Sequence, residues 1–135
     1  MLIIVNTASE CAFTSQYQEM QKLYNIYKKQ KLEIIAIPTN DFGGQEPGNI
    51  KHIIEFTKKF NRTFHIVDKV STDKKTGHEF FTWVRENGGT MAAPKWNFYK
   101  YLIDSNGKFV NYYVSTTNPT SPKITSAIED LLKSK

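Results

Sequence analysis

One cysteine, Cys11, is the residue of this chain best suited to nucleophilic chemistry. It follows an apolar run at 2–5 that is typical of a buried strand, and it precedes a helix expected to begin near Ser15. Ser15 and Gln18 have the spacing of a capping box. Just before a helix, a sulfur atom faces unpaired backbone N–H groups and the positive end of the helix dipole, which favour a thiolate. The position therefore predicts a reactive thiol, although a lone cysteine is more often a buried, inert side chain.

A second loop is expected to lie beside Cys11. The apolar run 32–37 precedes a long loop, 39–49, that contains Gln45. Two strands joined by a helix suggest a right-handed parallel unit, and the carboxyl ends of parallel strands meet at one edge of a sheet. We therefore expect Gln45 to approach Cys11. A phosphate-binding role for Gly43–Gly44 is a weaker alternative, because neither G-K-[ST] nor G-x-G-x-x-G is present.

The order of the expected elements predicts an α/β fold. Helices are expected at 15–30, 50–60, 76–86 and from Pro122 on, and strands at 2–5, 32–37, 64–67, 99–103 and 109–114. The last two strands flank the turn signal Asn106-Gly107 and should form an antiparallel hairpin. This order matches a thioredoxin-like fold: a central mixed sheet with parallel strands and a C-terminal antiparallel hairpin, and helices on both faces.

Length and composition are those of a globular chain with a single domain over residues 1–135. Hydrophobic residues make up 39% and charged residues 23% of the chain. No apolar run approaches the roughly 20 residues of a membrane helix, so no integral membrane association is expected. The net charge of +5 comes from scattered basic residues, which favours a solvated surface over a nucleic-acid partner. A single cysteine cannot close an internal disulfide, which fits a reducing, cytoplasmic location.

Three blocks of sequence carry a family resemblance. They are Val5–Thr14 (VNTASECAFT), Pro38–Gly48 (PTNDFGGQEPG) and Lys95–Phe98 (KWNF). In this order and at these separations they resemble the glutathione peroxidase family, and the resemblance extends over essentially the whole chain. It implies a thioredoxin-fold peroxidase, with Cys11 in the place of the residue that attacks peroxide.

The same resemblance implies a catalytic group of four residues, namely Cys11, Gln45, Trp96 and Asn97. The Cys11 thiolate would attack hydrogen peroxide or an organic hydroperoxide, giving water or an alcohol and a sulfenic acid. Gln45 and Asn97 offer amide N–H groups and Trp96 its indole N–H, all of them uncharged donors. Glutathione, another thiol or a thioredoxin-like reductant would then restore Cys11 through a mixed disulfide. This cycle needs no cofactor and no metal.

The chain departs from the family pattern at several places. Thr57 takes the place of the resolving cysteine of thioredoxin-dependent members, which favours a small thiol such as glutathione. Tyr112 stands where an arginine is usual. The resemblance implies that the family's N-terminal hairpin would be missing ahead of Leu2. The connection 86–96 is short, and by the same resemblance it would lack the extra loop of tetrameric members. We therefore expect a monomer with an open site that accepts bulky lipid hydroperoxides.

Two other functions remain open at this point. Without a resolving cysteine, Cys11 could serve a non-enzymatic redox sensor or relay that acts through a mixed disulfide with a partner protein. The positive net charge also suits a basic binding module for RNA or acidic lipids, which is the weakest of the three hypotheses. His52, His65 and His78 fall on different elements without ligand spacing, so no metal site is predicted.

Overall fold

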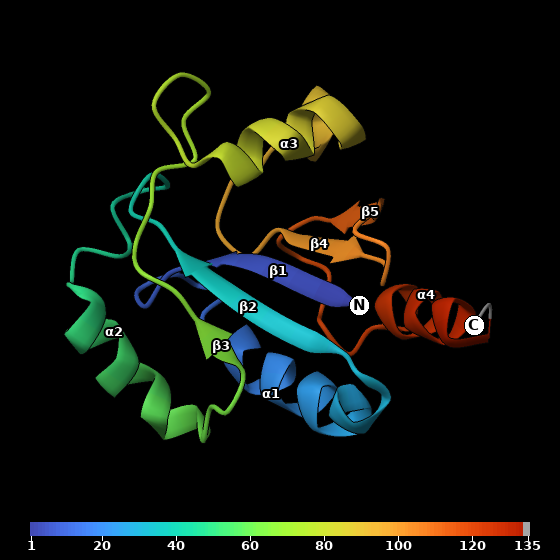
Figure 1. The fold of residues 1–135 in the computed structure, drawn as a ribbon. Helices are drawn as coiled ribbons and strands as arrows, with labels where there is room; N and C mark the ends of the chain where they lie inside the picture. Colours follow the sequence, from blue (N-terminus) through green and yellow to red (C-terminus); the bar gives the residue numbers. More distant parts are fainter. Residues whose placement is uncertain (134–135) are drawn as a thin grey trace.

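The structure is a computed structural model that describes residues 1–133, and within them five strands form one sheet in the order β3-β2-β1-β4-β5 (Figure 1). The strands are β1 (Leu2–Thr7), β2 (Glu33–Pro38), β3 (His65–Ile66), β4 (Lys100–Ile103) and β5 (Phe109–Tyr113). The helices are α1 (Gln16–Tyr27), α2 (Ile50–Thr57), α3 (Glu79–Gly88) and α4 (Pro122–Lys133), with short 3-10 turns at Lys28–Gln30, Lys58–Phe60 and Thr90–Ala92. The predicted order of elements is confirmed.

Strand β1 lies at the centre of the sheet and sets the position of the loops around it. It pairs in parallel with β2, with Val5 opposite Ala36, and antiparallel with β4, with Val5 opposite Lys100. Strand β5 closes the antiparallel hairpin on β4. The mixed sheet predicted from the sequence is therefore confirmed, and the carboxyl ends of β1 and β2 meet at one edge.

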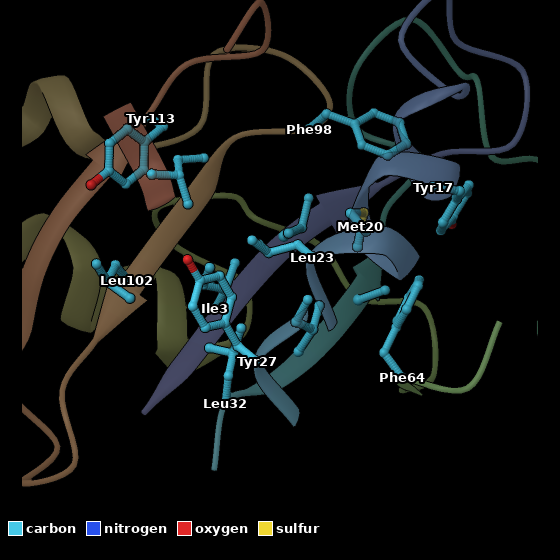
Figure 2. Close-up of a cluster of buried hydrophobic side chains, with 14 of the residues drawn as sticks. Ile3, Tyr17, Met20, Leu23, Tyr27, Leu32, Phe64, Phe98, Leu102 and Tyr113 are labelled. Atoms are coloured by element: carbon cyan, nitrogen blue, oxygen red, sulfur yellow. The ribbon is translucent and has the colours of Figure 1, made fainter. Parts of the chain in front are cut away.

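Helices cover both faces of the sheet. On one face α1 and α4 pack over β1 and β4, and Figure 2 shows side chains of α1 beside Ile3 and Leu102. On the other face α3 buries Phe81 and Val84 against a separate cluster that includes Tyr101. Helical spacing in the sequence predicts an apolar face of Tyr17, Met20, Leu23, Tyr24 and Tyr27. All of them are buried except Tyr24, which is half-buried, and Gln16 and Gln21 are buried as well. An amphipathic helix laid on a sheet explains this pattern.

The predicted capping box at the start of α1 is wrong. Ser15 has helical backbone angles (φ −58°, ψ −18°), and its side chain makes no capping hydrogen bond. The chain reaches α1 through consecutive turns instead, in which the Thr14 N–H donates to the Cys11 carbonyl and the Gln16 N–H to the Phe13 carbonyl. With Ser15 already helical, its hydroxyl is not in the extended cap geometry that reaches the first turn of a helix.

Helix α3 begins later than predicted, at Glu79 rather than Thr76. The reason is local, because the Asp73 carboxylate accepts hydrogen bonds from the Thr76 N–H and hydroxyl and so holds that segment in a turn. His78 then caps the helix, its Nδ1 accepting from the Phe80 N–H. None of the helices in residues 1–133 is both long and apolar enough to cross a bilayer. That residues 1–135 form a single domain stays a prediction.

Candidate active site

Cys11 lies in the turn that follows β1. Its N–H donates to Thr14 Oγ1 over 2.9 Å, and the Thr14 hydroxyl in turn donates to the Ala8 carbonyl over 2.9 Å. The Cys11 sulfur accepts a hydrogen bond from the Phe13 N–H over 3.4 Å. Cys11 is 8% exposed, between two exposed neighbours, Glu10 and Ala12. The sulfur thus has a fixed place near the surface and one backbone donor.

Gln45 lies against the Cys11 turn. The Glu10 N–H, one residue before the cysteine, donates to the Gln45 carbonyl over 3.0 Å. On the other side of Gln45, the Glu46 N–H donates to Asn40 Oδ1 over 2.9 Å, so Asn40 braces this loop. The sheet edge brings the two loops together because β1 and β2 run in parallel and end at the same level.

Asn97 connects the segment 95–98 to the loop that carries Gln45. Its Nδ2 donates to Gln45 Oε1 over 3.1 Å and to the Phe42 carbonyl over 3.3 Å. Asn97 itself is fully buried, and Gln45 is half-buried. Since the Gln45 carbonyl oxygen is engaged by Asn97, its Nε2 is the remaining donor, and within residues 1–133 it makes no hydrogen bond.

Trp96 packs over the same loop. Its ring lies 6.2 Å from the Phe42 ring, centroid to centroid, at an interplanar angle of 57°. Gly43 lies close to the indole, and a Cβ atom on it would lie 2.8 Å from Trp96 Cη2. Gly43 also has φ +70°, a conformation that side chains other than glycine's seldom adopt. The close approach of this loop to Trp96 therefore depends on glycine.

Asn6 on β1 anchors Trp96 and the residues that follow it. Its Nδ2 donates to the Trp96 carbonyl over 2.9 Å, and its Oδ1 accepts from the Tyr99 N–H over 3.0 Å. The backbone of Asn6 also bonds this segment, since its carbonyl accepts from the Phe98 N–H over 2.6 Å. Phe98 has a left-handed backbone (φ 63°), which is uncommon for an aromatic residue. The sequence did not reveal Asn6, because a polar residue inside a strand run gives no sign of a partner 90 positions away.

Lys100 is a buried lysine that is connected to Asn97 through Ser115. It is 1% exposed, and its Nζ donates to the carbonyls of Val114 and Ser115, each over 3.1 Å. The Ser115 hydroxyl donates to the Asn97 carbonyl over 2.5 Å. Burial lowers the pKa of Lys100 to about 7. The sequence gives no sign that this lysine is buried, because a lysine in a strand is usually on the surface.

Asp41 in the 39–49 loop and Thr57 on α2 serve other roles. Asp41 turns away from the cysteine, and its Oδ2 accepts from the Ser71 hydroxyl and from the Thr72 N–H and hydroxyl. Thr57, in the place of a resolving cysteine, is buried and donates its hydroxyl to the Ile54 carbonyl over 2.9 Å. Within residues 1–133 no group of three or more His, Cys, Asp or Glu side chains is placed to hold a metal ion.

A cysteine at the carboxyl end of the central parallel strand, within this sheet order, defines a thioredoxin-like oxidoreductase. The solved structures agree in fold. "Solution Structure of a Thioredoxin-like Protein in the Oxidized Form" aligns with a TM-score of 0.66 at 14% identity, covering 99% of this chain and 78% of that one. "Crystal structure of T. cruzi GPX1" aligns with a TM-score of 0.72 at 28% identity, covering 98% of this chain and 81% of that one.

Sequence comparisons give the family. The family model described as glutathione peroxidase matches residues 1–85. "Glutathione peroxidase homolog BsaA" of Bacillus subtilis (strain 168) is 42% identical over 123 residues, 88% of this chain and 77% of that protein. "Probable phospholipid hydroperoxide glutathione peroxidase" of Mesembryanthemum crystallinum is 42% identical over 125 residues, 90% of this chain and 74% of that protein. The chain belongs to the glutathione peroxidase family, and it is a peroxidase.

Proposed function

We propose that this chain reduces hydroperoxides with Cys11 as the nucleophile and a thiol as the electron donor. The observation that supports this most is the pair of hydrogen bonds that joins three distant segments, from Glu10 to Gln45 and from Asn97 to Gln45. They bring a free amide N–H, at Gln45 Nε2, to the loop beside the only cysteine of the chain.

In the first step the Cys11 thiolate attacks one oxygen of the hydroperoxide. A sulfur–oxygen bond forms as the oxygen–oxygen bond breaks, the sulfur loses two electrons, and the leaving oxygen takes up a proton to become water or an alcohol. Uncharged donors suit this step, because they stabilise negative charge on sulfur and on the leaving oxygen without forming a salt bridge. We assign this role to the Gln45 amide and the Trp96 indole. Asn97 supports it indirectly, because its two amide N–H groups are donated to Gln45 Oε1 and the Phe42 carbonyl and so orient Gln45.

In the second step a thiol reduces the sulfenic acid on Cys11. A sulfur–sulfur bond forms and water leaves; a second thiol then attacks the mixed disulfide, frees Cys11 and departs as a disulfide. The chain has one cysteine, so both thiols must come from other molecules. Glutathione or another small thiol is the donor we propose, and a thioredoxin-like protein is the alternative donor. Sulfur supplies both electrons, so the cycle uses no cofactor.

The proposed substrates, oligomeric state and compartment are inferences that start from membership of the family. We propose that hydrogen peroxide and organic or lipid hydroperoxides are all substrates, since relatives at 42% identity carry a phospholipid hydroperoxide name. We also propose a monomer in the cytoplasm, without nucleic-acid partners. A reducing compartment would keep the single thiol of Cys11 available for peroxide.

The test compares donors and variants in one assay. Consumption of hydrogen peroxide, tert-butyl hydroperoxide and a phospholipid hydroperoxide is followed with glutathione, and separately with thioredoxin and its reductase. Cys11→Ser should abolish turnover with every pair. Ser15→Ala is the matched control, because Ser15 is exposed and makes no capping bond, and it should turn over like the native chain. Undiminished turnover in Cys11→Ser would exclude the proposal.

A redox sensor is the second candidate, and the single cysteine is the observation that favours it. It predicts that a sulfenic acid forms on Cys11 in stoichiometric amount and is trapped by dimedone, with no multiple turnover by any small thiol. Sustained turnover with glutathione or thioredoxin excludes this alternative.

A further inference from the structure

Glu46 is a buried carboxylic acid directly after Gln45, and the proposed reaction gives it no role so far. Its exposed fraction is 0%, and its Oε2 accepts a hydrogen bond from the Ser9 hydroxyl over 3.0 Å. Within residues 1–133 its Oε1 is buried without a hydrogen-bond partner. Ser9 is itself buried, at 8% exposure, and lies two residues before Cys11. A side-chain bond therefore joins the cysteine turn to the glutamine loop.

This carboxyl group is costly for the fold. Burial raises the pKa of Glu46, which shows that the surroundings disfavour its charged form. The Ser9 hydroxyl and the nearby Lys69 and His52 lower that pKa and Glu10 raises it, but burial is the largest effect. An apolar or amide side chain of similar size would avoid this cost. The position of Glu46 thus calls for a reason other than stability.

The reason lies in what Glu46 holds. Its N–H donates to Asn40 Oδ1 over 2.9 Å, and its carbonyl accepts from Lys69 Nζ over 3.1 Å. Lys69 Nζ also donates to the Gly48 carbonyl over 2.9 Å. The backbone of Glu46 thereby ties the loop to Asn40, earlier in the same loop, and to Lys69 outside it. The side chain of Glu46 ties the loop to the cysteine turn. Gln45 lies between these anchors.

We propose that Glu46 is a positioning residue that, through its hydrogen bond to Ser9, holds Gln45 at the distance from Cys11 that peroxide reduction requires. This inference rests on the proposed function of Cys11. The backbone bond from Glu10 to the Gln45 carbonyl is the main-chain link between the loop and the cysteine turn. The Ser9–Glu46 bond links the same two segments a second time, through side chains and at the next residue of the loop. Two links between the loop and the turn hold Gln45 against Cys11 more firmly than one.

The test uses Cys11 as its own probe, because it is the only thiol of the chain. Two second-order rates are measured in single turnover on the full chain, oxidation of Cys11 by hydrogen peroxide and its alkylation by iodoacetamide. Ser9→Ala and Glu46→Ala should each slow oxidation about tenfold, the scale of one lost hydrogen bond, with a much smaller change in alkylation. Glu46→Gln should recover most of the oxidation rate lost in Glu46→Ala, because an amide oxygen still accepts from the Ser9 hydroxyl.

A double-variant cycle separates positioning from a merely structural role. If Glu46 acts through Gln45, Glu46→Ala should slow oxidation no further in a Gln45→Ala background. Additive effects, equal loss of oxidation and alkylation, or a Glu46→Gln variant as slow as Glu46→Ala would each overturn the inference. If Glu46→Ala does not fold, Ser9→Ala breaks the same bond from the other side. A native Cys11 no faster than a free thiol toward peroxide would instead refute the proposed function, with or without Glu46.

Discussion

Asn97 donates its side-chain amide to the side-chain oxygen of Gln45 over 3.1 Å, although 52 positions separate the two residues. This bond decides which end of the Gln45 amide stays available. With Oε1 occupied, Nε2 is the group left to interact with a peroxide or with sulfur. Asn97 is fully buried and cannot reorient without losing its bond to the Phe42 carbonyl as well.

Replacing Asn97 with alanine should therefore impair catalysis through Gln45. We expect Asn97→Ala to lower kcat/KM for hydrogen peroxide by roughly 10- to 100-fold, because the Gln45 amide loses its fixed orientation. Initial rates at limiting peroxide measure this. Asn106→Ala, in the exposed hairpin turn, is the control and should leave kcat/KM unchanged. An Asn97→Ala enzyme with native kcat/KM would contradict the role of this bond.

The contact between Gly43 and Trp96 predicts a difference between two adjacent glycines. Gly43 and Gly44 both have positive φ, +70° and +60°, so alanine is strained at either position. A Cβ at Gly43 would lie 2.8 Å from Trp96 Cη2, whereas a Cβ at Gly44 meets nothing within 4 Å. Gly43→Ala should displace the indole, change the tryptophan fluorescence and lower peroxidase activity several-fold more than Gly44→Ala. Equal activities would show that the Trp96 position is unimportant.

Asn6 should be important for stability as well as for the site. Its side chain makes two buried hydrogen bonds, to the Trp96 carbonyl and from the Tyr99 N–H. Asn6→Ala leaves both partners unsatisfied and should lower the free energy of unfolding by about 2–4 kcal/mol. Urea denaturation followed by circular dichroism gives this value. A loss below about 0.5 kcal/mol, the scale of an ordinary surface substitution, would show that water replaces both bonds.

Lys100 should make stability depend on pH in the neutral to alkaline range. Its pKa is about 7 in the folded chain, below the ordinary value of 10.5, so the unfolded chain binds more protons between these values. The free energy of unfolding should then rise with pH from about 7 to 9.5, by roughly 2–3 kcal/mol. Lys100→Met removes the titrating group and should flatten this slope. Urea denaturation of both chains at several pH values measures this dependence. If the free energy of unfolding of Lys100→Met rises with pH as in the native chain, Lys100 is not the group responsible.

Glu46 should have the opposite effect at acid pH: its contribution to the free energy of unfolding should fall as the pH rises. Burial raises its pKa above 4.5, so the folded chain binds more protons than the unfolded chain just above that value. Its contribution to stability is complete below pH 4.5 and is lost as the pH rises through the folded pKa. Glu46→Gln cannot ionise, so it should be more stable than the native chain at pH 7, with the difference shrinking toward pH 4. A difference independent of pH would rule out ionisation of Glu46 as its cause.

The order of elements and the approach of two loops could both be predicted from the sequence. Apolar runs at 2–5 and 32–37, joined by an amphipathic helix, are enough to predict parallel β1 and β2. Parallel strands end at the same edge, so Gln45 had to approach Cys11. Local signals were less reliable at helix starts, where the capping box at Ser15 was wrong, because the turn at Cys11 makes Ser15 helical before it can cap.

Which polar groups meet could not be predicted from the sequence and depends on the folded arrangement. The bonds from Asn97 to Gln45, from Asn6 to Trp96 and from Ser9 to Glu46 join residues 37 to 90 positions apart. Periodicity in a sequence indicates which face of a strand or helix is buried. It does not indicate which group a buried amide or carboxyl will bond to. Partners are set when β4 pairs with β1 and the loops close over the sheet edge, since only then do these groups leave water together and satisfy one another.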